Sequence, residues 1–324
     1  MAAPSATEVN SPGRFCPAHY GYAPGDFARA VDFVADTLIV VGGLYGNLAA
    51  LDAAEALLAA EADHARLVFN GDFHWFDIDP DDFAAIEARV LRHVALRGNV
   101  ETELAGDDSG AGCGCAYPDN VSDAEVARSN AILERLRRTA QESPASPARL
   151  GRLPMNRVAE VGGLRIGLVH GDAESLAGWR FSSEALDRTE ATVWLNAVRQ
   201  ASGIDVFASS HTCLPTLRQF ALPDGALTVI NNGAAGMPNF AGTLYGVATR
   251  ISTRPASMCK SPTLYGVRHG ALHIDAVALH YDRQAWRAQF LRDWPEGSVA
   301  HASYWKRIAG GPDYDLVSAA GEYL

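Results

Sequence analysis

Short apolar runs that end at a glycine or small residue, followed at once by a polar side chain, recur along this 324-residue chain. The clearest run, Leu67 to Asn70, is followed by Gly71 and Asp72. Such a run is typical of a buried strand, and the glycine allows the sharp turn that leaves a carboxylate at the rim of a sheet. Polar residues at the ends of successive strands converge on one crevice in an α/β sheet. We therefore expect a functional site built around Asp72.

Four other segments repeat this pattern of apolar run, small residue and then a metal-binding or turn-forming residue. They are residues 38–47, 95–99, 166–172 and 206–211. Between and after these segments, strands and helices are expected to alternate. The expected strands are 37–41, 66–69, a strand ending at 97, 157–161, 164–169, 205–208, 217–222, 227–230, 263–268 and 271–279, and the expected helices are 47–61, 80–91, 122–141, 184–201 and 283–291. This alternation predicts a partly parallel sheet with crossover helices.

The expected organisation is an N-terminal arm over 1–36, a main domain over 37–293 and a C-terminal tail over 294–324 that packs on the domain. Residues 105–150 interrupt the strand–helix rhythm, first with a glycine-rich loop that carries Cys113 and Cys115. We expect this segment to be an inserted helical cap over the crevice, with the cysteine loop as its mobile part, because it follows Asn99 directly.

The composition excludes several classes of function. A formal net charge of −11 argues against a nucleic-acid polymer as partner, since phosphates would be repelled overall. No apolar run approaches the roughly 18–20 residues of a membrane span, and residues 1–12 lack the pattern of a signal peptide. Five cysteines in a chain of this size do not indicate a disulfide framework. We expect a cytoplasmic protein with no membrane partner.

Taken in order, the polar blocks resemble those of the calcineurin-like metallophosphoesterases, especially the small bacterial branch. The family's blocks are DxHGN, GDxxD, GNH(D/E), a histidine at a strand end, and GHxH. Their counterparts are residues 43–47, 71–75, 98–101, His170 and 210–213, and the resemblance extends over roughly 37–290. It implies an α/β four-layer αββα sandwich, in which helices flank two mixed sheets, with the inserted cap in addition.

The family site holds two metal ions that share a bridging aspartate and activate a hydroxide for attack on phosphorus. In this sequence the residues that match the ligands of one of the two metals are all present, and they are Asp72, Asn99, His170 and His211. Two histidines, a carboxylate and a carboxamide suit one divalent transition metal such as Zn²⁺, Fe²⁺ or Mn²⁺. The alternative is a set of inherited polar residues that hydrogen-bond to one another in an inactive site.

The ligands of the second metal are missing. Gly43 stands for the family's aspartate, Tyr45 for a histidine and Cys213 for the last histidine, while Val100 replaces the histidine that assists the leaving group. We expect Tyr45, Cys213 and Asn47 to bind substrate in the emptied half. The alternative for Tyr45 and Cys213 is that they fill the space by packing or hydrogen bonding.

His74 and Asp72 are the candidate catalytic residues, and the alternative for His74 is a hydrogen-bonded loop residue. Cys113 and Cys115 either touch the site or serve no chemical role. The arginines of the helix over 122–141 either face solvent or capture phosphate above the crevice.

The function expected is that of a divergent metal-dependent phosphoesterase with a one-metal site, acting on a small phosphorylated, nucleotide-like molecule. The alternatives are a pseudo-enzyme or ligand-binding protein on this fold, or a different reaction that uses the altered site. The sequence leaves oligomerisation open.

Overall fold

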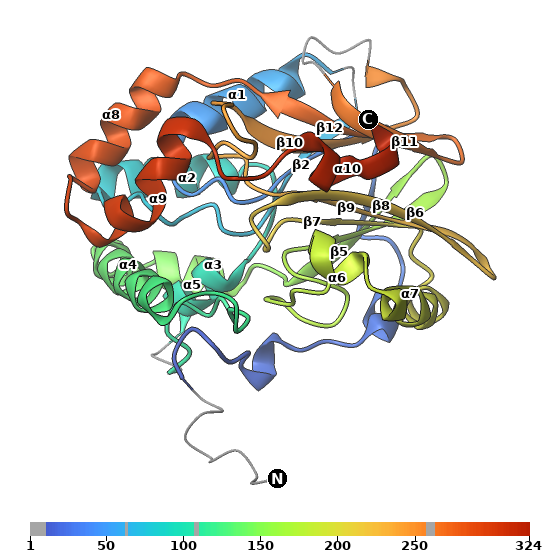
Figure 1. The fold of residues 1–324 in the computed structure, drawn as a ribbon, viewed down its shortest axis with the longest axis horizontal. Coiled ribbons are helices and arrows are strands. Elements are labelled where there is room, and N and C mark those ends of the chain that lie inside the picture. The colour runs from blue at the N-terminus through green and yellow to red at the C-terminus, as the bar shows by residue number, and fades with distance from the viewer. Residues whose placement is uncertain (1–10, 62–63, 107–109, 257–262) are drawn as a thin grey trace, which may run out of the picture.

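The computed structural model describes residues 11–61, 64–106, 110–256 and 263–324. Two six-stranded sheets stack face to face, and helices cover their outer faces (Figure 1). The predicted fold class, two mixed sheets flanked by helices, is confirmed. Within the described residues, no helix is long and apolar enough to span a membrane.

The first sheet has the strand order β11-β12-β10-β2-β3-β4. Its parallel strands are β2 (Thr37–Val41), β3 (Ala65–Asn70) and β4 (Val94–Leu96), joined by the crossover helices α1 (Leu48–Ala59) and α2 (Pro80–Val90). Its antiparallel strands are β10 (Gly246–Ser252), β11 (Thr263–His269) and β12 (Leu272–Leu279).

The second sheet has the strand order β1-β5-β6-β7-β9-β8. Its strands are β1 (Phe33–Val34), β5 (Asn156–Val161), β6 (Leu164–Val169), β7 (Val206–Ser209), β8 (Pro215–Leu222) and β9 (Gly225–Asn232). β6, β7 and β9 run parallel, and α7 (Thr189–Ser202) covers their outer face after the short helix α6 (Ser183–Leu186).

Apolar residues are buried both between the two sheets and under the helices on the outer face of the first sheet, and alternate residues of β2 point into each of these cores. In β2, Leu38 and Val40 pack with residues of the second sheet, such as Ile166, whereas Ile39 and Val41 pack under the helices on the outer face. Both faces of β2 are therefore buried, which is why its sequence is continuously apolar.

Two further groups of helices complete the fold. One group lies in the chain between β4 and β5, and the other follows β12 at the C-terminal end. They are α3 (Asn99–Ala105), α4 (Asp123–Gln141), α5 (Ser146–Gly151), α8 (Arg283–Asp293), α9 (Val299–Gly310) and α10 (Leu316–Ala320). The predicted capping box of Ser122 and Glu125 begins α4. Three of the arginines on α4 make protein contacts: Arg128 donates to Ser303 on α9, Arg135 donates to Thr139, and Arg137 donates to Glu103.

Several elements differ from expectation, and the short elements β1, α3, α5 and α10 were not predicted. The helix expected over 184–201 is two helices, α6 and α7, separated at Asp187 and Arg188. Strand β10 was not predicted, because its buried Arg250 makes the sequence look too polar for a central strand; Glu61 neutralises that arginine at 2.6 Å. Helix α9 was likewise not predicted within the mixed sequence of the tail.

Candidate metal centre

The four predicted metal ligands lie together because each follows the carboxyl end of a parallel strand. Asp72 follows β3 and Asn99 follows β4 in one sheet, whereas His170 follows β6 and His211 follows β7 in the other. The two strand ends are tied by a hydrogen bond of 3.0 Å from Nδ2 of Asn70 to the carbonyl oxygen of Val169. The site therefore lies where the carboxyl ends of the parallel strands of both sheets meet.

Backbone geometry at Asp72 and Gly98 brings these strand ends close. Asp72 has a φ of 52°, in the left-handed region that aspartate tolerates better than most residues. A β-carbon on Gly98 would lie 2.2 Å from Oδ1 of Asp72, so a larger residue at 98 would displace the carboxylate. The glycine is thus required by the position of Asp72.

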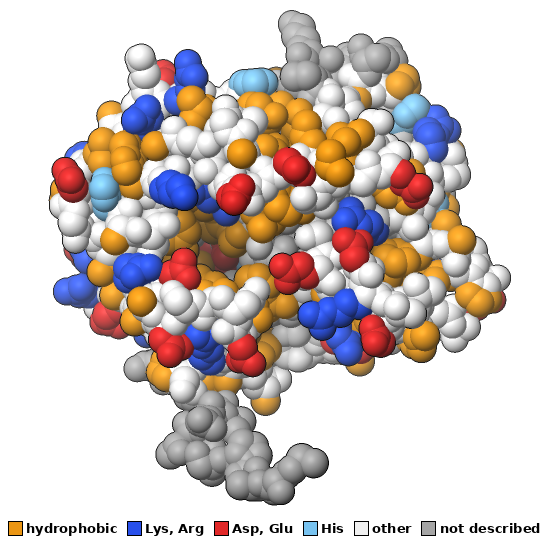
Figure 2. Space-filling model, viewed as in Figure 1, with side chains coloured by type: hydrophobic (Ala, Val, Ile, Leu, Met, Phe, Trp, Pro, Cys, Tyr) orange, Lys and Arg blue, Asp and Glu red, His pale blue; other side chains and the backbone are white. Residues whose placement is uncertain are grey.

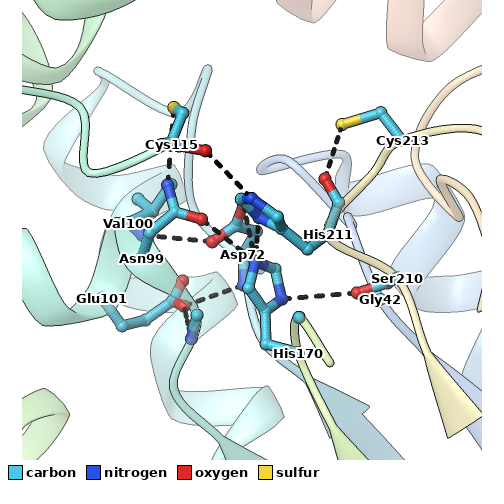
Figure 3. Close-up of polar contacts among 12 residues, drawn as sticks. Gly42, Asp72, Asn99, Val100, Glu101, Cys115, His170, Ser210, His211 and Cys213 are labelled. Carbon is cyan, nitrogen blue, oxygen red and sulfur yellow. Dashed lines mark hydrogen bonds and ion pairs between the residues drawn. The ribbon is translucent and has the colours of Figure 1, made fainter. Parts of the chain in front are cut away.

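The donor atoms converge on Nε2 of His170 (Figure 3). This nitrogen lies 3.0 Å from Oδ1 of Asn99, 3.1 Å from Nδ1 of His211 and 3.3 Å from Oδ2 of Asp72. Ligand atoms that share a metal at about 2.0–2.2 Å lie roughly 3–3.5 Å from one another. The spacing in the cluster matches a single shared ion.

The outward-facing atoms of both imidazoles contact backbone carbonyl oxygens, which only accept hydrogen bonds. Nδ1 of His170 lies 3.0 Å from the oxygen of Asn70, and Nε2 of His211 lies 3.0 Å from the oxygen of Cys115. Each of these nitrogens therefore carries the proton, so in the neutral rings Nε2 of His170 and Nδ1 of His211 point lone pairs at each other. A cation between them satisfies both, and the carbonyl contacts are those that orient metal-binding histidines.

The charge balance favours a positive charge beside Asp72. Burial, together with His170, lowers the pKa of His211 to about 3, so this ring stays neutral. Burial alone would lower the pKa of His170, but the carboxylate of Asp72 raises it overall. Burial would raise the pKa of Asp72, yet its neighbour His170 lowers it. The carboxylate is thus ionised and needs a cationic partner.

Asn99 is oriented by the inserted loop. Its Nδ2 donates to the carbonyl oxygen of Cys113 at 2.9 Å, which turns Oδ1 toward His170. Cys113 and Cys115 therefore lie at the site, which matches the first alternative for them, and they contact Asn99 and His211 through their backbone oxygens. Both cysteines are buried. Residues 107–109 lie outside the described residues.

Glu101 fixes the turn that carries Asp72. Its buried carboxylate accepts hydrogen bonds from the backbone N–H groups of Asp72, Phe73, His74 and Gly98 at 2.8–3.2 Å. It thereby ties the end of β3 to the start of α3. The sequence placed Glu101 in the third polar block but gave no sign of this task.

Tyr45 fills the half of the site that lacks its metal ligands. A β-carbon on Gly43 would lie 2.9 Å from two carbons of the Tyr45 ring, and the phenol oxygen lies 2.9 Å from Sγ of Cys213. Burial raises the pKa of both groups, so the pair stays neutral. The structure thus favours filling of the space over the open ligand pocket expected there.

A small cavity of about 30 Å³ remains beside the donor atoms. Tyr45 and Cys213 line it, as do Asp72, Asn99 and His211; the remaining wall is Trp75, Val100, Cys115, Tyr117, Trp179 and Tyr304. The last three were missed because no motif surrounds them. Trp179 follows His170 in an irregular segment, and Tyr304 lies on the unpredicted helix α9.

Two predicted site residues lie away from the cavity wall. Asn47 caps α1 by accepting from the N–H of Ala50, and its Nδ2 donates to the oxygen of Gly236. His74 is buried, pairs with Asp77 through Nδ1 and stacks on Phe83 at 3.9 Å between ring centroids. These contacts match the hydrogen-bonded alternative for His74.

Similarity to known proteins is visible in the fold. No protein-family model matches the sequence, and no curated protein is significantly similar to it. A metallophosphoesterase from Sphaerobacter thermophilus matches with a TM-score of 0.51 and 16% identity, over 85% of this chain and 100% of that one. The hypothetical protein PH1004 from Pyrococcus horikoshii matches with a TM-score of 0.55 and 16% identity, over 87% and 100%. At this identity the likeness establishes the fold.

Proposed function

We propose that the protein is a metal-dependent phosphoesterase that holds one divalent transition-metal ion, either zinc, iron or manganese, and acts on a small phosphorylated molecule. The observation that carries this proposal is a cluster of four donor atoms, in which those of Asp72, Asn99 and His211 lie within 3.3 Å of Nε2 of His170. The fold shared with a metallophosphoesterase supports a phosphoester as the substrate.

A bound ion of this kind supplies Lewis-acid chemistry, which polarises a phosphoryl group and acidifies water. The chain's own residues hold and shield the site. Glu101 anchors the turn of Asp72, and the Cys113 and Cys115 carbonyls orient Asn99 and His211. Trp75 and Val100 keep bulk water away from the cavity.

The hydroxyl groups at the cavity wall belong to tyrosines. Tyr45, Tyr117 and Tyr304 all line it, and burial raises the pKa of each phenol above its usual range. Each therefore keeps its proton and can donate a hydrogen bond to a phosphoryl oxygen. His74 has no part in this proposal, because it does not line the cavity.

A second candidate is a protein that binds metal and ligand without hydrolysis. Two observations favour it, the replacement of the leaving-group histidine by Val100 and the small volume, about 30 Å³, of the cavity. A valine cannot transfer a proton, and this volume holds about one water molecule.

Elemental analysis and activity assays together separate the candidates. The full chain is loaded with zinc, iron(II) or manganese, its metal content is measured, and it is assayed on aryl phosphates and phosphodiesters. We expect about one ion per chain and hydrolysis that is lost in Asp72→Ala and His170→Ala. His93→Gln is the control, since His93 contacts Glu55 and lies away from the site. One ion without hydrolysis would favour the second candidate, and absence of any ion would contradict both.

A further inference from the structure

A groove of about 840 Å³ lies next to the metal-site cavity, and the side chain of Trp179 lines both spaces. Figure 2 shows a hollow near the middle of the face drawn, between α9 and α3, the two helices that contribute Tyr304, Asn99 and Val100 to the wall of the metal-site cavity. The groove is lined by residues 118–121, by α6 and the loop before it, by Thr212 next to the ligand His211, and by Tyr314. It therefore begins where the metal-site cavity ends.

The cavity by itself cannot hold a phosphoester. Its volume of about 30 Å³ corresponds to roughly one water molecule, so the part of an ester beyond phosphorus must lie elsewhere. Among the residues that line the cavity, Trp179 alone also lines the groove in the described part of the chain.

Trp179 is held on the cavity side by three contacts. Its indole N–H donates to the carbonyl oxygen of Cys115 at 3.0 Å, and its ring packs edge-on against His211 at 5.3 Å between centroids. Tyr117 packs against it at 6.1 Å. The side chain is only half-buried. Rotation of Trp179 would join the two spaces at the loss of one hydrogen bond, which water can replace.

The groove wall combines aromatic rings with hydroxyl groups and lacks an excess of positive charge. Trp179 and Tyr314 offer rings, and Ser183 and Thr212 offer hydroxyls. Two arginines face three acidic residues, and one of those arginines, Arg180, is paired with Glu174 at 2.6 Å. The chain as a whole carries a charge of −11. A second phosphate would therefore be repelled, whereas a neutral ring can stack on the indole.

We propose that this groove binds the alcohol part of the phosphoester, that this alcohol carries a ring and is uncharged or cationic, and that Trp179 is the specificity-determining partition between the groove and the metal ligands. The proposal rests on the proposed function for the identity of the ester. The aromatic rings and the charge of the groove wall are the basis for this choice of alcohol.

The first test compares two esters whose alcohols are similarly poor leaving groups, benzyl phosphate and methyl phosphate, on the metal-loaded full chain. We expect kcat/KM to be at least tenfold higher for the benzyl ester. Ser183→Trp, which fills the groove, should reduce this ratio at least tenfold, and Ala185→Trp, which fills the groove from another position of α6, serves the same purpose if the first variant fails to fold. The control Trp194→Phe should keep the ratio, because Trp194 contacts Arg180 but lines neither space. An unchanged ratio in both filling variants would overturn the assignment.

The second test needs no turnover. 4-Nitrobenzyl alcohol, a neutral quencher, should quench tryptophan fluorescence saturably in wild type and Trp194→Phe, and this saturable quenching should be lost in Trp179→Phe and Ser183→Trp. The anionic 4-carboxybenzyl alcohol should compete at least tenfold more weakly, and equal competition would refute the charge assignment. If no ester is hydrolysed, the proposed function fails. The quenching experiment still tests whether the groove binds the alcohol, since absence of Trp179-dependent quenching would refute that proposal independently.

Discussion

The ring of Tyr45 occupies the space into which a side chain at Gly43 would project, with ring carbons 2.9 Å from the position of a β-carbon there. An aspartate at 43 and a tyrosine at 45 cannot share this space in the present arrangement. The absence of the aspartate and histidine that the metallophosphoesterase resemblance leads one to expect at positions 43 and 45 is therefore one coupled difference. Cys213 completes it by contacting the phenol of Tyr45 at 2.9 Å.

Gly43→Asp alone is expected to lower the free energy of unfolding by about 1–3 kcal/mol, because the new side chain overpacks against Tyr45. Urea unfolding measures this loss. Gly163→Asp is the matched control, since Gly163 also has a positive φ, 79° against 62° at Gly43, but faces open space. An equal loss in both variants would mean that backbone strain, and not the ring of Tyr45, is the cause.

Changing all three positions should restore the second metal. In Gly43→Asp/Tyr45→His/Cys213→His the ring is removed and three ligands are added next to Asp72, so metal content should rise from about one to about two ions per chain. Elemental analysis after metal loading gives the result. A triple variant that folds but still holds one ion would show that the family's second site requires more than its ligands.

Glu101→Gln should weaken metal binding about 10–100-fold, as expected when a residue that orients a metal ligand is changed. The amide would place N–H groups against backbone N–H groups that now donate to a carboxylate. Competition with a chelator of known affinity measures the change. Glu103→Gln is the control, because Glu103 is a buried glutamate on the same helix that contacts Tyr20 and Arg137. Equal weakening in both variants would indicate a general loosening of α3.

His74→Gln should lower the free energy of unfolding by about 3–5 kcal/mol at low pH, because it breaks a buried pair with Asp77. Burial would lower the pKa of His74, but Asp77 and Glu101 raise it overall. A raised histidine pKa gives its full stabilisation below the unfolded value of 6.5, and this is lost as pH rises through the folded value. The difference from wild type should therefore shrink above about pH 6.5 in urea titrations of chelator-treated protein. Loss of the metal ion in His74→Gln would instead support a role for His74 in the site.

Cys113 and Cys115 should resist alkylation in the native protein. Both side chains are buried and therefore inaccessible, and burial raises the pKa of Cys115 well above its usual range, so Cys115 does not present a reactive thiolate. Among the cysteines that the structure describes, the exposed Cys16 should react before these two, and peptide mass spectrometry after iodoacetamide treatment gives the order. Fast labelling of Cys115 would support the alternative of a different reaction that uses the cysteine loop.

The sequence was sufficient to predict which polar side chains gather at the candidate site, because their positions follow from strand ends. Asp72, Asn99, His170 and His211 each end an apolar run, and parallel strands of a sandwich bring such ends together. Those features are local in sequence, so they can be recognised without knowing the packing. The extents of the arm, the cap insertion and the tail remain predictions.

The filling of the second half of the site could not be predicted in the same way. Whether Tyr45 lines an open pocket or occupies the void depends on its φ of 55° and on its contact with Cys213, far away in sequence. Strand β10 was hidden for a similar reason, because Arg250 looks polar until its partner Glu61 is known. In each case a long-range contact decides what a single residue does.

The wall of the cavity is assembled from Tyr45, Tyr117, Trp179 and Tyr304, and Arg307 on the same helix as Tyr304 donates to the carbonyl oxygen of Cys213 at 2.7 Å. The four candidate ligands follow strands of the two sheets, whereas Tyr304, which is part of the wall, belongs to α9. An ion bound by these ligands would lie behind Trp179 and Tyr304, and its exchange would require local opening of this wall. The rate at which a chelator removes the ion should thus report the opening of α9 and Trp179, and not the intrinsic affinity of the four ligands.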